Sequence, residues 1–283
     1  MRLPDSSCHS LLKNGATEDG EYKVKINGVI KTVYCDMKTL GGGWTILQRR
    51  GDFGRNKNYF LRNWNDYKNG FGDPVEDVWL GLEAAHHLTK ESEFQLMVVL
   101  QDFDNNSTSL IVNNFTIGPE EEGYKISYKN YNSKIGNSLP ARGTKFSTID
   151  TDNDAWSKNC AKRFSGAWWY SACHNSNLNG LYLRGPHESF GNGVNWYHWR
   201  GYNYSLKFSE MKIRPYDAIN GGSNDDKNNL GGTTTAAPGS EEASQGTTAA
   251  TAGTGAAAGT NGDAPATSSN TPAPDAAQNN PGS

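Results

Sequence analysis

The chain has 283 residues and a formal net charge of −3, and it divides into two parts of very different composition. Residues 219–283 hold six acidic residues and one basic residue, which leaves 24 acids and 26 bases in residues 1–218. This near-neutral body gives no indication of the basic face that a nucleic-acid partner would need, so we expect no nucleic-acid binding. No stretch comes near the roughly 20 apolar residues that cross a bilayer, so we expect no membrane insertion.

Residues 219–283 form a low-complexity segment. They include no aromatic residue and no cysteine, and their only aliphatic residues larger than alanine are Ile219 and Leu230. Such a segment cannot bury enough apolar surface to offset its ordering entropy, so we predict a disordered tail. Its Thr, Ser and Pro content is typical of O-glycosylated stalks, and an inert extension is the alternative. Residues 1–7 lack the apolar run of a signal peptide and are treated as a leader segment.

Residues 8–218 contain all eight tryptophans and are long enough for one large domain with a buried core. The four cysteines can pair in three ways, and pairing in sequence order, Cys8 with Cys35 and Cys160 with Cys173, is the simplest. Zinc binding is the rival use of four cysteines, but the sequence has no C-x-x-C pair. Disulfides indicate a secreted, extracellular protein. Four sequons for N-glycosylation agree with this location: Asn105, Asn106, Asn114 and Asn203.

The first half of this body has the patterns of a sheet with short helices. Tyr22, Val24 and Ile26 alternate with charged residues, and Asn27-Gly28 separates them from a second β-rich run over residues 29–34. This pattern predicts a hairpin with a type I′ turn. Further strands are predicted over residues 44–49, 94–100, 109–112, 115–117 and 124–128, and short helices over residues 64–68 and 80–88.

Residues 132–208 have a different character, because they are rich in Asn, Ser, Gly and Trp and show little periodicity. A loop of this length is either functional or disordered, and its aromatic content argues against disorder. We therefore predict an irregular functional region that packs on the sheet, followed by a closing strand over residues 206–213. Asp150, Asp152 and Asp154 lie close together in this region, and such aspartates supply the oxygen ligands that hard cations prefer.

The three aspartates do not fit an EF-hand. If Asp150 were its first ligand, Ala155 would occupy the position of the turn glycine and Ala161 that of the bidentate glutamate. A calcium loop here must be of another kind. A solvated Asp/Asn turn is the alternative interpretation, because these residues favour turns in any case.

Several motifs between Cys8 and Tyr216 resemble those of fibrinogen-like domains. The matching segments are Y-C-D-M and G-G-G-W-T-I-L-Q-R-R (residues 34–50), N-G-F-G-D and V-W-L-G-L-E (69–83), C-A-K-R-F-S-G-A-W-W-Y-S-A-C-H (160–174), S-N-L-N-G (176–180), N-W-Y-H-W-R-G-Y-N-Y-S-L-K (195–207) and E-M-K-I-R-P (210–215). The resemblance implies the same disulfide pairs and an α+β domain over residues 8–218. Its three subregions would be an N-terminal disulfide hairpin, a central mostly antiparallel sheet with short helices, and a loop-rich calcium- and ligand-binding subregion.

The resemblance also implies a calcium site. Measured by distance from Cys160, the family's calcium ligands fall on the carboxylates of Asp152 and Asp154 and on the backbone carbonyls of Trp156 and Lys158. Oxygen-only ligation of this kind suits Ca²⁺, which is the cofactor that we expect. Asp150 would support the loop from outside the ligand set.

In the acetyl-binding lectins of this family, of the tachylectin and ficolin type, an aromatic funnel lies beside the calcium loop. Matching positions give this ligand-binding set: Phe164, Cys173, His174, Phe190, Gly191 and Tyr202. The resemblance further implies a cis peptide bond between Ala172 and Cys173 that turns the Cys173 N–H toward an acetyl oxygen. A methyl group fits an apolar aromatic cup and an amide carbonyl needs a donor, so the chemistry agrees. The alternative is that these aromatics are ordinary core residues.

Two positions depart from the acetyl-binding pattern. Phe164 and Phe190 stand where tyrosine is common in these lectins, so two hydrogen-bonding hydroxyls are missing and acetyl specificity has less support than the pocket itself. The fibrin-polymerising relatives hold a basic peptide N-terminus with a carboxylate at the position of Phe164, so we do not expect peptide capture of that type.

The resemblance therefore predicts a secreted, calcium-dependent lectin of innate immunity that binds acetylated glycans on microbial or cell surfaces and can act as a homo-oligomer. The alternative is a receptor ligand or adhesion protein of the angiopoietin-like or tenascin-like type. The chain lacks the coiled-coil or repeat regions usual there. No nucleophile elbow or zinc-binding helix occurs, so we expect no enzyme.

Two further features are interpreted as structural. Arg50-Gly51-Asp52 spells an integrin-type motif, and we interpret it as a chance match at the end of a strand. The histidines without metal-ligand spacing are interpreted as packing or surface residues: His86, His87, His187 and His198.

Overall fold

The computed structural model of the chain describes residues 6–90, 92–129, 135–136 and 138–216. The predicted tail and residues 1–5 of the predicted leader lie outside the described residues. Within the described ranges, no helix is long and apolar enough to cross a membrane.

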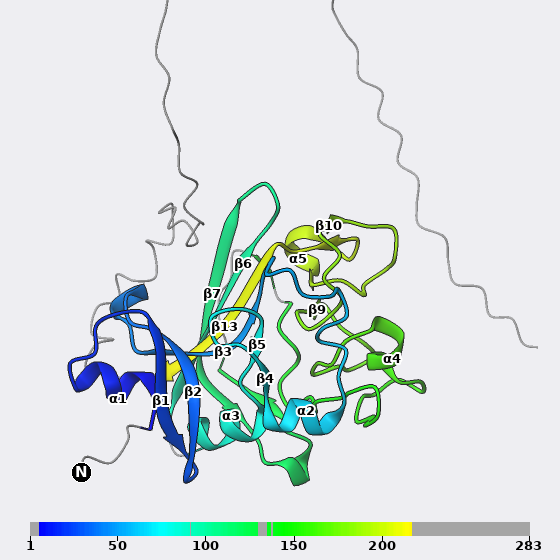
Figure 1. Cartoon of the computed structure of the whole chain (residues 1–283). Coiled ribbons are helices and arrows are strands. Elements are labelled where there is room, and N and C mark those ends of the chain that lie inside the picture. The colour runs from blue at the N-terminus through cyan, green and yellow to red at the C-terminus, as the bar shows by residue number, and fades with distance from the viewer. Residues whose placement is uncertain (1–5, 91, 130–134, 137, 217–283) are drawn as a thin grey trace, which may run out of the picture. The chain divides into compact units, whose positions relative to one another are not determined.

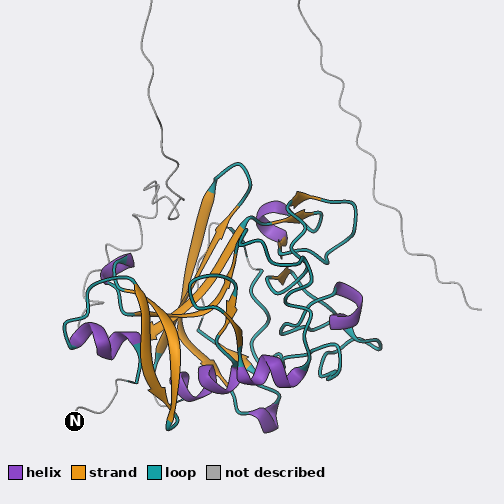
Figure 2. Cartoon of the chain, in the orientation of Figure 1, coloured by secondary structure: helices purple, strands orange, loops and turns teal. Residues whose placement is uncertain are grey.

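The described elements are short except in one sheet. The helices are α1 (Cys8–Lys13), α2 (Trp64–Asn69), α3 (Leu82–Thr89), α4 (Cys160–Phe164) and α5 (Tyr197–Arg200), with the 3-10 turns η1 (Thr39–Gly41) and η2 (Glu120–Glu122). The strands are β1 (Gly20–Ile26), β2 (Val29–Asp36), β3 (Trp44–Arg50), β4 (Phe71–Gly72), β5 (Val78–Trp79), β6 (Phe94–Gln101), β7 (Ser107–Ile117), β8 (Ile126–Ser127), β9 (Ser176–Asn177), β10 (Gly185–Pro186), β11 (Asn195–Trp196), β12 (Tyr204–Ser205) and β13 (Phe208–Pro215). Figure 2 shows the long strands gathered in one part of the domain and loops dominating the other.

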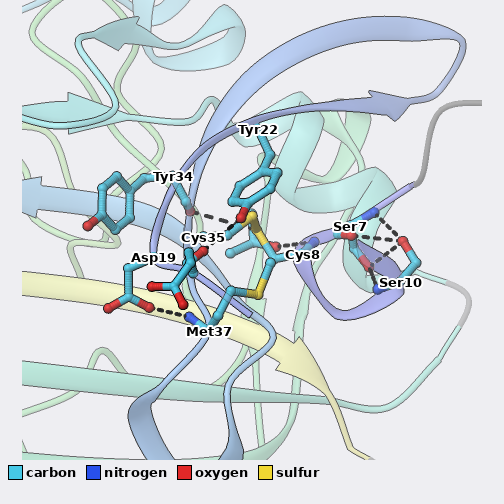
Figure 3. Close-up of a disulfide and its surroundings, with 10 residues drawn as sticks. Ser7, Cys8, Ser10, Asp19, Tyr22, Tyr34, Cys35 and Met37 are labelled. Carbon is cyan, nitrogen blue, oxygen red and sulfur yellow. Dashed lines mark hydrogen bonds between the residues drawn. A yellow bond between two sulfur atoms is a disulfide. The ribbon is translucent and has the colours of Figure 1, made fainter. Parts of the chain in front are cut away.

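The N-terminal subregion is a disulfide-linked hairpin of β1 and β2. Asn27 and Gly28 have φ angles of 47° and 80°, and two positive φ angles are the geometry of the predicted type I′ turn. Cys8, at the start of α1, is bonded to Cys35 in β2, and their Cα atoms lie 5.4 Å apart (Figure 3). Both the predicted hairpin and its disulfide are confirmed.

The main sheet has the strand order β1-β2-β3-β13-β6-β7-β8, and β4 and β5 pair beside β3. The pairs along this path are all antiparallel. The last strand, β13, lies between β3 and β6, as Figure 1 shows. The predicted mostly antiparallel central sheet is therefore confirmed, and β13, the last of the described strands in sequence, lies in its interior.

One strand is longer than predicted. The patterns at residues 109–112 and 115–117 predict two strands, but both belong to β7. Between them the register with β6 shifts, and Asn114 has a left-handed φ of 53°. The polar pair Asn113-Asn114 therefore forms a β-bulge inside one strand, which interrupts the apolar alternation without ending the strand.

The core continues from the sheet into the loop-rich subregion. The rings of Trp79 and Phe146 have centroids 5.8 Å apart, and those of Phe146 and Trp169 are 5.0 Å apart in an edge-to-face arrangement. All three side chains are buried. This shared aromatic packing fixes the irregular loops after residue 138 on the sheet although they contain few regular hydrogen bonds.

The Arg50-Gly51-Asp52 tripeptide is part of this packing. Arg50 is only 1% exposed, and its guanidinium lies 3.9 Å from the ring centroid of Phe60. Asp52 forms an ion pair with Arg184. A receptor cannot reach a buried arginine, so the interpretation of this motif as structural is confirmed.

A buried network of charges crosses the middle of the sheet. Lys212 Nζ lies 2.6 Å from Asp36 and 3.1 Å from Glu210, which in turn accepts from Arg49 at 2.8 Å. Burial alone would raise the pKa of Asp36, but the charge and hydrogen bond of Lys212 outweigh it and lower that pKa. Burial would likewise lower the pKa of Lys212, but the two carboxylates raise it. The charged forms are thus the stable ones.

We expect Asp36→Asn to lower the free energy of unfolding by about 3 kcal/mol, because it removes one partner of a buried ion pair. The new side chain keeps an oxygen for the backbone N–H groups of Lys38 and Thr39, which now donate to Asp36 at 3.1 and 2.8 Å. Urea unfolding at neutral pH measures the effect. The matched control is Glu18→Gln, which breaks an exposed pair with Lys38 and should change stability little.

The same ion pair has a defined pH dependence. Folding lowers the pKa of Asp36. The ionised carboxylate therefore makes its full contribution to the free energy of unfolding above the ordinary pKa of 3.8, and this contribution is lost as the pH falls through the lower pKa of the folded state. The stability difference between wild type and Asp36→Asn should therefore shrink in acid. A difference that stays constant down to pH 3, or an equal loss in the control, would contradict this account.

Candidate functional site

The predicted calcium loop curls around the carboxylate of Asp154. One of its oxygens accepts the backbone N–H of Trp156 at 2.9 Å, and the other accepts that of Cys160 at 2.8 Å. Asp152 is exposed, and its carboxylate lies 3.3 Å from the backbone nitrogen of Asp154. Burial and the neighbouring charge of Asp152 raise the pKa of Asp154, against the two backbone hydrogen bonds. The loop therefore holds two carboxylates together at an electrostatic cost.

Asp150 bonds to other groups than this pair does. Its carboxylate accepts the backbone N–H of Trp64 at 2.9 Å and the hydroxyl of Thr148 at 2.7 Å. These contacts tie the loop to the start of α2, which agrees with the supporting role predicted for Asp150.

The donor set suits a hard cation. The predicted ligand set adds the backbone carbonyls of Trp156 and Lys158 to the two carboxylates, and no backbone N–H in the described part of the chain donates to either carbonyl. All four groups offer oxygen, as Ca²⁺ requires. No cluster of three or more His, Cys, Asp or Glu residues suited to a metal occurs among the residues that the structure describes. The candidate site therefore depends on two carboxylates and on backbone oxygens.

A disulfide joins this loop to the predicted ligand site. Cys160 is bonded to Cys173, with Cα atoms 5.7 Å apart, as predicted. The peptide bond between Ala172 and Cys173 is cis, also as expected. Ala155 donates its backbone N–H to the carbonyl of Ser171 at 3.0 Å, a second tie between the two segments. The backbone N–H of Cys173 has no acceptor among the described residues.

Four of the six predicted ligand-binding residues form an aromatic cluster centred on His174. Its ring centroid lies 4.7 Å from that of Phe164 and 5.7 Å from that of Tyr202, both edge-to-face. Phe190 lies 4.6 Å from Tyr202 and 6.5 Å from Phe164. The rings thus close a loop of contacts, while Phe190 remains 53% exposed. We call these four residues the aromatic cluster.

Gly191 completes the predicted set. Its φ of 68° is left-handed, and a β-carbon there would lie 3.1 Å from the ring of Phe164 and 3.5 Å from that of His174. Its backbone N–H donates to the carbonyl of Tyr202 at 3.1 Å. The absent side chain therefore leaves room between two rings of the cluster.

His174 is neutral in this setting. Burial lowers its pKa to about 4, and the nearby Gly191 backbone offsets this only in part. Both ring nitrogens are buried, and neither makes a well-aligned hydrogen bond in the described part of the chain, although the Gly191 backbone is close enough to affect the pKa. A buried imidazole always carries at least one N–H, so His174 holds a donor without a well-aligned acceptor inside the aromatic cluster.

The sequence prediction missed the residues that hold the cluster in place. Asn177 donates to the carbonyls of Phe164 at 3.2 Å and Gly191 at 3.4 Å, and it accepts from the buried hydroxyl of Tyr170 at 2.7 Å. It belongs to the motif S-N-L-N-G, whose small polar residues were the available signal. Tyr197 was also missed, and its ring stacks on Tyr202 with centroids 4.6 Å apart.

The predicted glycosylation asparagines differ in exposure. Asn105, Asn106 and Asn203 are exposed, whereas Asn114 is half-buried in the bulge of β7. The amide nitrogen of Asn203 lies 3.2 Å from the backbone carbonyl of His187, so this side chain also fastens the loop before the cluster.

The histidines outside the cluster behave as packing and surface residues. His86 lies 2.8 Å from a backbone carbonyl of β7, His87 lies 3.0 Å from the carboxylate of Glu83, and His198 lies 2.8 Å from a serine hydroxyl. Burial lowers the pKa of His187.

Comparison with known proteins places this geometry in a family. Residues 5–216 match the family described as "Fibrinogen beta and gamma chains, C-terminal globular domain". The Fibrinogen C domain-containing protein 1-B of Xenopus laevis is 46% identical over 218 residues, which cover 74% of this chain and 47% of the relative. Techylectin-5A of Tachypleus tridentatus is 43% identical over 220 residues, which cover 76% of this chain and 75% of the relative. The chain thus spans about half the length of the first of these relatives.

Solved structures give the same result. The fibrinogen-like globe domain of human ANGPTL6 matches with a TM-score of 0.71 and 36% identity, over 77% of this chain and 99% of that domain. Lamprey fibrin D-dimer, complexed with the peptide Gly-His-Arg-Pro-amide, matches with a TM-score of 0.73 and 28% identity, over 85% of this chain and 80% of the other. Sequence and fold together show that the chain belongs to the family of fibrinogen C-terminal globular domains.

Proposed function

We propose that this chain is a secreted lectin without enzymatic activity, which binds N-acetylated sugars or other acetylated ligands on microbial or cell surfaces. The observation that supports it best is the aromatic cluster around His174, which follows the disulfide and the cis peptide directly. The name of the relative Techylectin-5A, at 43% identity, points to the same class of protein.

The cluster offers the two kinds of contact that an acetamido group needs. Its methyl group would pack among the rings of Phe164, Phe190 and Tyr202, since apolar aromatic walls favour such a group. Its carbonyl oxygen would accept from the backbone N–H of Cys173 and from the imidazole N–H of His174, neither of which has a well-aligned acceptor among the described residues. A sugar without an acetyl group would leave both donors unsatisfied, which disfavours its binding.

Calcium would act through the loop and need not touch the sugar. Held by Asp152 and Asp154 with the carbonyls of Trp156 and Lys158, Ca²⁺ neutralises the paired carboxylates when bound. Asp154 accepts the N–H of Cys160, so the loop and the disulfide before the cluster share one hydrogen bond. Ordering the loop would therefore order the cluster.

One acetylated sugar offers little contact area, so single-site binding should be weak, with a Kd of about 1 mM. Effective capture of a surface would then require several sites, because linked sites convert later binding events into intramolecular ones. Assembly into a homo-oligomer would supply them.

A receptor ligand or adhesion protein is the second candidate, and the likeness to the globe domain of ANGPTL6 favours it. Lamprey fibrin binds its peptide Gly-His-Arg-Pro-amide in a related fold. The aromatic cluster contains no carboxylate to receive a basic peptide terminus, however, which favours the lectin.

We expect N-acetylglucosamine to bind and glucose not to bind. Tyr202→Ala should open the wall of the cluster, and His174→Ala should remove a donor, so each should weaken binding by roughly tenfold. Ligand-detected NMR titration measures these affinities. Tyr22→Ala, in the distant hairpin, is the control and should leave them unchanged. Equal binding of the two sugars, or indifference to both cluster substitutions, would instead favour the receptor-ligand alternative.

The substitution Asp152→Asn tests the proposed calcium site. The new side chain keeps an oxygen for the 3.3 Å contact with the backbone N–H of Asp154, so losing the charge of Asp152 should weaken Ca²⁺ binding by at least about tenfold while leaving the loop intact. Calorimetric titration with Ca²⁺ measures this. Asp150→Asn is the matched control, because its carboxylate faces Trp64 and its remaining oxygen keeps that bond. Equal losses in both variants would mean that the ion binds elsewhere or not at all.

The two overlapping sequons at the tip of the β6–β7 hairpin should not be used equally. The amide nitrogen of Asn106 donates to the buried carboxylate of Asp102 at 3.0 Å, whereas Asn105 is exposed and only its oxygen is engaged, by Lys207 at 2.6 Å. On secretion we therefore expect a glycan on Asn105. Mass spectrometry of glycopeptides should show its loss in Asn105→Gln and its persistence in Asn106→Gln, and the reverse result would contradict this assignment.

A further inference from the structure

An exposed aromatic surface continues beyond the aromatic cluster. Tyr197 stacks on Tyr202 with ring centroids 4.6 Å apart and an angle of 27° between the rings. Phe190 lies at the same centroid distance from Tyr202. Tyr197 is 46% exposed and Phe190 is 53% exposed, so the shared ring of Tyr202 stands between two rings that face solvent. We call Phe190, Tyr202 and Tyr197 the aromatic strip.

Tyr197 is held on a fixed element. It begins α5 and donates its backbone N–H to the carbonyl of Asn175 at 2.9 Å. The next residue, His198, donates its backbone N–H to the hydroxyl of Ser138, and Arg200 pairs with the buried Asp102. The ring is therefore positioned before any ligand arrives, which lowers the entropy lost on binding.

If Tyr197 served only to support Tyr202, its ring would not need to be exposed to solvent. Tyr202 is already fixed, because its hydroxyl lies 2.9 Å from the carbonyl of His174 and 3.0 Å from Asn175 Oδ1. One face of Tyr197 stacks on Tyr202 and the ring of His198 lies 5.0 Å away, yet 46% of Tyr197 remains exposed. Large exposed aromatic groups beside a candidate site are typical of binding surfaces.

We propose that the aromatic strip is a second subsite that takes the neighbouring sugar of an acetylated oligosaccharide. A pyranose has one face of C–H groups and an edge of hydroxyls, and the strip offers matching chemistry. The ring of Tyr197 supplies an apolar surface. The exposed ring of His198 lies 5.0 Å from it, and the exposed Asn175 accepts from the hydroxyl of Tyr202 at 3.0 Å, so polar groups border the strip. The strip carries no charged group, which disfavours an ionic ligand. This inference rests on the proposed function, since Tyr202 belongs to both surfaces.

The test compares N-acetylglucosamine with its β1,4-linked disaccharide, di-N-acetylchitobiose, by ligand-detected NMR titration. The quantity of interest is the ratio of the two dissociation constants. In the wild type we expect the disaccharide to bind at least about fivefold more tightly, from one added sugar–ring contact. In Tyr197→Ala the gain in affinity of the disaccharide over the monosaccharide should fall to about twofold. This is the statistical effect of having two acetyl groups on one disaccharide molecule. Tyr197→Phe, which keeps the ring, should retain most of the wild-type gain.

Tyr216→Ala is the matched control, because Tyr216 is an exposed tyrosine (37%) at the far end of β13, and it should leave the ratio unchanged. Thermal unfolding checks that each variant folds. A wild-type gain of no more than twofold, or a gain that survives Tyr197→Ala, would overturn this inference while leaving the acetyl site intact. Failure of the monosaccharide itself to bind the wild type would overturn the proposed function and this subsite with it.

Discussion

Two side chains of β3 reach out of the sheet and bind the backbone of the loop-rich subregion. Gln48 donates to the carbonyl of Leu178 at 3.0 Å, and Arg50 donates to the carbonyls of Leu178 and Gly180 at 3.0 and 2.9 Å. Both side chains are buried. Burying a loop leaves carbonyls without water, and each unpaired group destabilises the fold, so these bonds make burial of this segment feasible. The carboxylate of Asp77 balances the charge of the Arg50 guanidinium, with Asp77 Oδ1 3.7 Å from Arg50 Nε.

The segment that β3 holds in place also holds residues of the candidate ligand site. Asn177 directly precedes Leu178, and its amide holds the carbonyls of Phe164 and Gly191. Asn179 follows, and it donates to the carbonyl of Ala167 at 3.0 Å. In this subregion, hydrogen bonds from side-chain amides to backbone carbonyls hold neighbouring segments together, as hydrogen bonds between backbones do in a sheet. A region with few regular elements can in this way hold its aromatic rings in fixed positions.

Local patterns predict the parts of this structure that local contacts determine. The type I′ hairpin follows from Asn27-Gly28, and the cysteine spacing together with the family resemblance gives the right disulfides. Contacts between distant segments are not encoded in such patterns. The role of Asp150 depends on Trp64, 86 positions away, and the stacking of Tyr197 depends on how α5 turns back toward Tyr202. The resemblance predicted a set of site residues, but it did not reveal the residues that pack around them.

The central place of β13 has a consequence for the newly made chain. Its register pairs Ser209 with Arg50 on one side and with Leu100 on the other, so it joins the two halves of the sheet. Translation delivers this strand after every other strand that the structure describes, and until then the edges of β3 and β6 lack their partner and can pair with other chains. Such distant pairing is slow, which lengthens the exposure. A premature stop codon between β6 and β13 would therefore yield an aggregation-prone fragment and not a partly active protein.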